Sequence, residues 1–101
     1  MNQLSYPDWR AIIRYSAGPQ PNVLYEEGGF KVVLAGLEPG GKIPLHPEGA
    51  AMYHFLEGSG VMLVDDERIE VKPGATIITP AGASRGMEAT TRLAFIAARM
   101  S

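Results

Sequence analysis

Short runs of apolar residues, separated by glycine, proline or acidic residues, follow one another along most of the chain. Runs of this length, bounded by turn-forming residues, favour β-strands over helices. The segment Arg68–Val71 alternates polar and apolar positions, as a strand with one buried face does. Many short strands with frequent turns predict an all-β sandwich or barrel. The predicted strands are Asn22–Glu26, Phe30–Leu37, Ile43–Leu45, Met52–Leu56, Val61–Val64, Arg68–Val71, Thr76–Thr79 and Leu93–Met100.

Turn signals between these strands have the composition of tight connections. Gly28-Gly29 is typical of a hairpin turn, and Asp65-Asp66-Glu67 and Pro73-Gly74 predict two further turns. The N-terminal region differs. There, Asp8 can cap a short helix over Trp9–Tyr15 with Ile12 and Ile13 on its buried side.

Length and composition narrow the class of protein. A chain of 101 residues with 46% hydrophobic and 20% charged residues predicts one folded domain, residues 1–101. Because Gly18-Pro19-Gln20-Pro21 breaks any regular element, we expect residues 1–21 to form an N-terminal extension and residues 22–101 to form the barrel.

Charge and residue usage exclude several function classes. The net charge is −2 with acidic and basic residues interspersed, which predicts no nucleic-acid partner. No apolar run approaches the ~18 residues of a membrane span, and the N-terminus does not have the pattern of a signal peptide, so a cytoplasmic location without a membrane partner is expected. The chain contains no cysteine, which excludes disulfides, zinc–thiolate sites and thiol nucleophiles.

Two blocks rich in glycine and proline carry a more specific signal: Pro39–Glu48, which closes on Leu56–Gly60, and Pro73–Arg85. Together they resemble the paired motifs of the cupin superfamily, over a region from about Phe30 to the C-terminus. The resemblance implies a double-stranded β-helix, the cupin or jelly-roll barrel, here with a short N-terminal helical segment. It also favours a strand at Leu93–Met100, whose apolar spacing fits a helix as well.

Most of the metal-ligand positions implied by the resemblance are substituted. His46 takes the place of the first histidine and Glu48 the second; because the block is one residue short, His46 can also take the second place, with Pro44 in the first. Ala51 stands where the metal-binding glutamate is expected, and Arg85 where the third histidine is expected. Alanine offers no donor and arginine no lone pair. We therefore expect no cofactor; a divalent transition metal on His46 and Glu48 with non-standard ligands is the alternative.

Four residues form the predicted ligand-binding pocket: His46, Glu48, Tyr53 and Arg85. In this hypothesis Arg85 presents its fork of donors to a carboxylate or phosphate, Glu48 neutralises it in the empty state, and His46 is a polar wall or proton-transfer group. Each residue also has a purely structural interpretation: His46 and Glu48 bonded to loop backbone, Arg85 solvated at the barrel mouth, and Tyr53 packed in the core.

Three function classes remain open. The first is a protein that binds a small, anionic molecule in the barrel without a full metal site. The second is an enzyme, either a metal-dependent dioxygenase or isomerase, or a metal-free isomerase with His46 as base and Tyr53 as acid. The third is a structural or partner-binding domain with a filled barrel. A homodimer is expected in addition, because the hairpin Asn22–Leu37 supplies an apolar edge.

Overall fold

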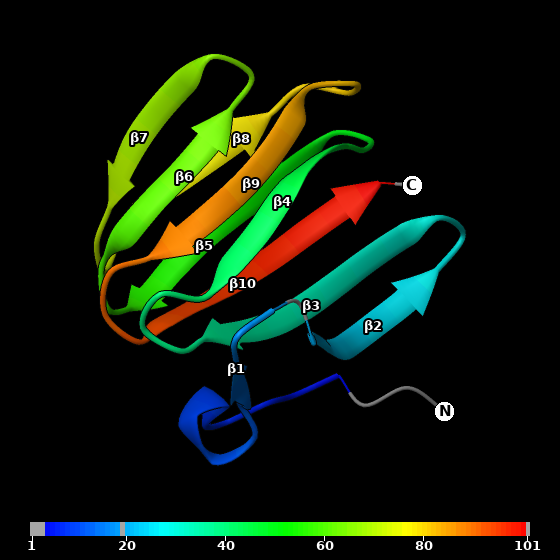
Figure 1. The fold of residues 1–101 in the computed structure, drawn as a ribbon. Helices are drawn as coiled ribbons and strands as arrows, with labels where there is room; N and C mark the ends of the chain where they lie inside the picture. Colours follow the sequence, from blue (N-terminus) through cyan, green and yellow to red (C-terminus); the bar gives the residue numbers. More distant parts are fainter. Residues whose placement is uncertain (1–3, 19, 101) are drawn as a thin grey trace.

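Two β-sheets pack face to face in the computed structural model, which describes residues 4–18 and 20–100 (Figure 1). One sheet has the order β1-β3-β10-β5-β8, with β2 also paired to β3, and the other has the order β4-β9-β6-β7. The strands are β1 (Tyr15–Ser16), β2 (Asn22–Glu27), β3 (Phe30–Leu37), β4 (Lys42–Pro47), β5 (Ala51–Glu57), β6 (Gly60–Val64), β7 (Glu67–Val71), β8 (Thr76–Thr79), β9 (Ser84–Ala89) and β10 (Leu93–Met100).

The chain alternates between the two sheets, so strands distant in sequence become neighbours. The last strand, β10, lies between β3 and β5, and β9 lies between β4 and β6. This arrangement is the double-stranded β-helix expected from the sequence, and the fold class is confirmed. The turns at Gly28-Gly29, Asp65-Asp66 and Pro73-Gly74 are also present.

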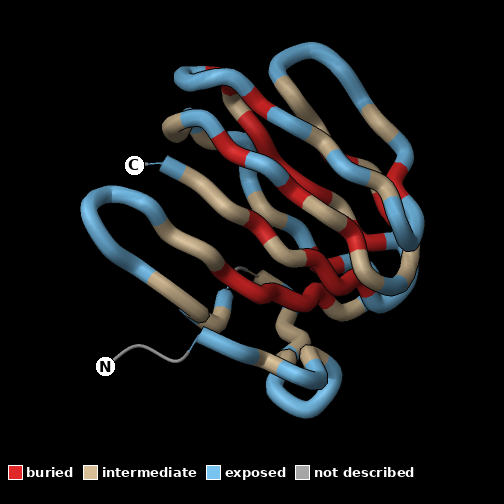
Figure 2. Tube along the Cα trace, turned by 180° about the vertical axis from the view of Figure 1, so that it is seen from behind, coloured by how far each residue is buried: buried red, intermediate tan, exposed pale blue. Residues whose placement is uncertain are grey.

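The core lies between the sheets and is built from inward-facing residues of both. Figure 2 shows buried residues concentrated in the middle of the strands and exposed residues at the connecting turns. Period-two alternation accounts for the pattern: in β5, buried Ala51, Tyr53 and Phe55 alternate with more exposed neighbours. Phe95 of β10 packs against both Tyr53 and Phe55, with ring centroids 6.1 and 5.7 Å apart.

The N-terminal segment departs from its predicted helix. Only one 3-10 turn forms, η1 (Trp9–Ala11), capped as expected by the Asp8 side chain, which accepts from the Arg10 backbone N–H at 3.1 Å. Ile12 is 36% exposed instead of buried. A helix this short has little cooperative stabilisation. The chain instead forms β1, which pairs in parallel with β3. No helix in the described part of the chain has the length and apolar character needed to span a membrane.

Strand β9 was missed from the sequence, and it is an interior strand of its sheet. Its residues, Ser84–Ala89, include no β-branched or aromatic side chain, so they lack the composition of a strand. A glycine at position 86 allows close packing against β4: a Cβ there would lie 2.6 Å from the carbonyl oxygen of Ile43. The strand therefore forms because its neighbours pair with it, and not because of its own propensity.

Candidate functional site

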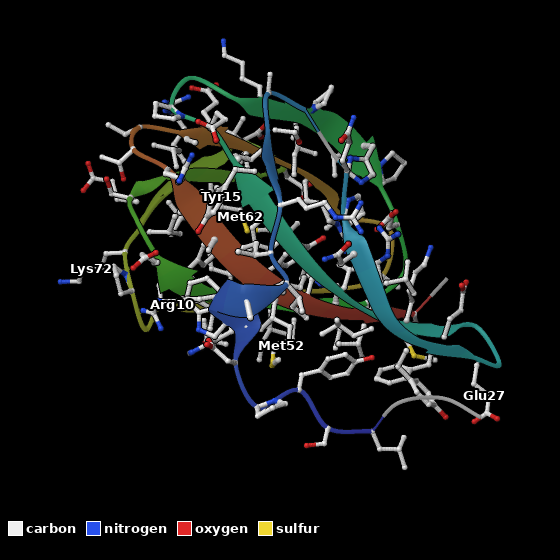
Figure 3. The ribbon with its side chains drawn as sticks, turned by 90° about the horizontal axis from the view of Figure 1, so that it is seen from below. Arg10, Tyr15, Glu27, Met52, Met62 and Lys72 are labelled. Atoms are coloured by element: carbon white, nitrogen blue, oxygen red, sulfur yellow. The ribbon has the colours of Figure 1, made fainter. Side chains whose placement is uncertain are left out.

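A cavity of about 480 Å³ lies between the sheets. Figure 3 shows Met62, one of its lining residues, between the sheets, whereas Glu27 and Lys72 project outward. Most of the wall is apolar, and Gln20 and Pro21 of the N-terminal segment contribute to it. The apolar wall includes Val33, Leu37, Met62, Met87, Phe95 and Ala97. Besides Gln20, four polar side chains line the cavity: His46, Tyr53, Arg85 and Arg99.

Arg85 is the largest buried side chain, with 1% of its surface exposed. Its Nε donates to the carbonyl of Ala83 at 3.2 Å and its Nη1 to the carbonyl of Gly49 at 2.8 Å. Its Nη2 donates to the carbonyls of Glu48, Pro80 and Ala83 at 3.1, 3.3 and 2.9 Å. The guanidinium therefore ties the loop after β4 to the loop before β9. Its donor fork, predicted to receive an anion, is occupied by backbone carbonyls.

The sequence-based hypothesis paired Glu48 with Arg85, but in the structure Glu48 pairs with Arg99. Its carboxylate lies beside the end of β10, where Arg99 Nη1 donates to both of its oxygens at 2.6 and 2.7 Å. Nε2 of His46 lies 3.6 Å from the nearer of these oxygens. Glu48 borders a neighbouring recess together with Glu26 and Lys31, and it does not line the main cavity. Three ionisable groups are thus in contact beside the cavity: Glu48, which lies behind the wall, and His46 and Arg99, which line it.

The ring of His46 is oriented by its own strand. Its Nδ1 lies 2.9 Å from the carbonyl oxygen of Pro44. Because a carbonyl can only accept, Nδ1 carries the proton, and in the neutral ring Nε2 offers a lone pair. His46 therefore contributes an acceptor beside the cavity, and its bond to loop backbone agrees with the structural interpretation as well.

Tyr53 projects from β5 into the cavity and is 6% exposed. Burial raises the pKa of its hydroxyl above the usual value, and the nearby guanidinium of Arg85 offsets part of the rise. The phenol is therefore neutral near pH 7. Its O–H is a hydrogen-bond donor at the wall of the cavity.

The donor set does not fit the metal ion that the fold family implies. A mononuclear site needs about three or four imidazole or carboxylate donors directed at one point. Arg85 and Ala51 supply none, and the Glu48 carboxylate is held by Arg99. Across residues 4–18 and 20–100, no group of three or more histidine, cysteine, aspartate or glutamate side chains could hold a metal.

His46, Tyr53 and Arg85 line the same cavity, and their role in ligand binding stays a prediction. Arg99, which the sequence reasoning missed, lines this cavity as well. A signal for Arg99 was present, because Leu93–Met100 was predicted as a strand. Period-two alternation then places Arg99 on the same face as Phe95 and Ala97. Its register partner in β5 is Ala51, and this small residue leaves room beside the Arg99 side chain.

Comparison with known proteins agrees with the architecture. A conserved protein of unknown function from Streptococcus pyogenes is similar in fold, with a TM-score of 0.86 and 20% identity over 100% of this chain and 90% of that one. Protein TT1209 from Thermus thermophilus gives a TM-score of 0.83 and 21% identity over 96% of this chain and 98% of that one. A cupin superfamily protein from Desulfitobacterium hafniense gives a TM-score of 0.76 and 18% identity over 80% of this chain and 75% of that one.

At these identities the solved structures show the shared fold alone, and no curated protein matches the chain in sequence. A family model provides the assignment. The model described as the cupin domain matches residues 33–98, more than half of the chain and the region that contains both motif blocks. The chain therefore belongs to the cupin family.

Proposed function

We propose that this protein binds a small amphipathic molecule inside its barrel. The observation that carries the proposal is the cavity of about 480 Å³, which is apolar over most of its wall and has a few polar groups converging on one side. Cavities of ~300–1,000 Å³ with this lining are typical of small-molecule sites. The apolar wall favours an apolar ligand body, and the polar side favours a head group that accepts hydrogen bonds.

Tyr53 is the anchor of the head group in this proposal. Its ring is buried and packs against Phe95, so little freedom is lost when a ligand binds. The phenol proton is the donor that a ligand oxygen meets. Nε2 of His46 offers an acceptor to a ligand hydroxyl or amide.

The experiment is a calorimetric titration and thermal melt with 1-octanol and octanoate, which share an apolar chain and differ in head group. At a free concentration about a hundredfold above its Kd, a bound ligand stabilises the fold by about 2.7 kcal/mol. We expect at least one of the two to bind with one-to-one stoichiometry and raise the melting temperature. No binding of either would contradict the proposal.

Two adjacent alanines of β10 provide a matched control for the location. Ala97 faces the cavity and is 1% exposed, whereas Ala98 faces the opposite side of the sheet and is absent from the lining. Ala97→Phe should fill part of the cavity and remove binding, whereas Ala98→Phe should retain it. A folded Ala97→Phe variant with wild-type affinity would show that the ligand binds elsewhere.

A further inference from the structure

Arg99 lines the cavity and has hydrogen-bond donors that no other described residue uses. Its Nη1 is taken by Glu48 at 2.6 and 2.7 Å. In the part of the chain that the structure describes, no hydrogen bond involves its Nε or Nη2. These two nitrogens form one edge of the planar guanidinium, where two parallel N–H groups match the two oxygens of a carboxylate.

The charges around the polar side of the cavity do not balance. Arg85 and Arg99 carry two permanent positive charges, and Glu48 supplies one negative charge, which pairs with Arg99. Among the residues described, no ion pair reaches Arg85, whose partners are neutral carbonyls. The nearby Lys31 and Glu26 pair with each other at 3.9 Å. One positive charge therefore remains without a counter-charge in a largely desolvated setting, which favours a bound anion.

We propose that Arg99 binds the ligand head group and that the ligand class is a monoanionic carboxylate on an apolar body. The proposal deepens the proposed function and rests on it. Arg85 acts behind the site: its donors stay on the loop carbonyls, while its charge balances the ligand. Glu48 accepts from Nη1 alone, so the edge formed by Nε and Nη2 is the part of Arg99 that the ligand meets. Tyr53 donates the additional hydrogen bond to the carboxylate.

The test is the affinity of octanoate against that of 1-octanol, measured by titration calorimetry on the full chain at neutral pH and low salt. We expect wild-type protein to prefer octanoate. Arg99→Gln should weaken octanoate by about tenfold to a hundredfold, the range for one lost charge-assisted contact. The same substitution should change octanol affinity by less than about threefold, well below that range. Arg99→Lys keeps the charge without the planar edge, so its octanoate affinity should lie between those of wild type and Arg99→Gln.

Arg68→Gln is the matched control variant. Arg68 belongs, like Arg99, to an arginine–glutamate pair, with Glu88 at 3.9 Å, but it is exposed and lies outside the cavity lining. The Arg68→Gln substitution should leave octanoate affinity unchanged. Glu48→Gln provides a result of opposite sign: it frees Arg99 and leaves two positive charges uncompensated, so octanoate should bind several-fold more tightly.

The outcomes separate the two proposals. If octanol and octanoate bind equally, or if Arg99→Gln reduces both alike in a protein with a wild-type melting profile, the monoanion assignment fails and the amphipathic-ligand proposal stands. Unchanged or weaker octanoate binding in Glu48→Gln would overturn the charge count on which the assignment depends. If neither probe binds wild-type protein, both proposals fail together.

Discussion

Replacing Arg85 with methionine should destabilise the fold, because this side chain connects two loops from inside the barrel. Methionine has a similar length and is compatible with the buried, partly apolar surroundings, so the change mainly removes hydrogen bonds and charge. Two of the four carbonyls concerned keep a backbone partner: Glu48 accepts from Gly82 at 2.8 Å, and Pro80 accepts from Ala83 at 3.2 Å. The other two, of Gly49 and Ala83, lose the donors that Arg85 provides.

The magnitude follows from these two carbonyls. A buried acceptor left without its donor costs about 1–3 kcal/mol, which gives about 2–6 kcal/mol for the pair. Removal of a buried charge that has no counter-ion offsets part of this loss. We therefore expect the free energy of unfolding to fall by about 2–4 kcal/mol, a large share of the total stability of a small domain.

The assay is equilibrium urea denaturation of wild-type protein, Arg85→Met, Arg85→Lys and the surface control Arg68→Met. The lysine variant keeps the charge but has three donors on one atom instead of a planar fork, so it should lie between wild type and methionine. Arg68→Met should remain within about 0.5 kcal/mol of wild type. If Arg85→Met also remains within about 0.5 kcal/mol, the guanidinium does not hold the loops and the reasoning is refuted.

Three further predictions concern other parts of the molecule. Gly58 and Gly74 both have positive φ, +86° and +93°, but a Cβ at Gly58 would overlap a neighbouring carbonyl, whereas a Cβ at Gly74 would meet nothing within 4 Å. Thermal melts should therefore show Gly58→Ala to be clearly less stable than Gly74→Ala, and equal losses of stability would contradict the packing argument. The pKa of Tyr53 in the folded state is raised above 10.0, so the unfolded chain loses the phenol proton first as pH rises. The free energy of unfolding should therefore fall above about pH 10, and it should fall less in Tyr53→Phe. Identical pH profiles for the two proteins would contradict this prediction. The edge strand β2, where Val23 is 50% exposed, is the candidate surface for the predicted homodimer. Light scattering should show that Val23→Lys shifts a dimer toward monomer, whereas Ile78→Lys, at the opposite edge of the sheet, does not. A wild-type protein that is monomeric at micromolar concentration would exclude the dimer.

The strands that could be predicted from the sequence are those whose own residues favour strands. Phe30–Leu37 and Thr76–Thr79 have the predicted bounds in the structure. Leu93–Met100 also has its predicted bounds, but its own spacing fits a helix as well, and the resemblance to cupins favoured the strand. Strand β9 could not be predicted in this way, because its pairing is decided by β4 and β6 on either side of it. The N-terminal helix was predicted from a correct cap at Asp8, but a local cap cannot show that the following residues will pair with β3 instead.

The candidate site was predictable in position but not in connectivity. Counting within the motif blocks places His46 and Arg85 beside each other, and the structure pairs them across β4 and β9. Which acceptors a buried guanidinium meets depends on loop paths that spacing alone does not give. For the same reason, the partner of Glu48 could not be read from the blocks: Arg99 lies at the far end of the chain, and the barrel topology brings it near.

The two cavity arginines differ in their contacts: Arg85 bonds loop carbonyls, and Arg99 bonds a single carboxylate. This difference has a consequence for how the proposed ligand selectivity can change. Arg85 is committed to the architecture, since any replacement disturbs two loops at once. Arg99 and His46 are partly exposed, and neither is needed to close a loop by a comparable set of bonds. Under the proposed function, substitutions at these two positions alter which head group binds while the barrel remains intact. In that case the residues that stabilise the fold differ from those that select the ligand, so ligand selectivity can change during evolution without loss of stability.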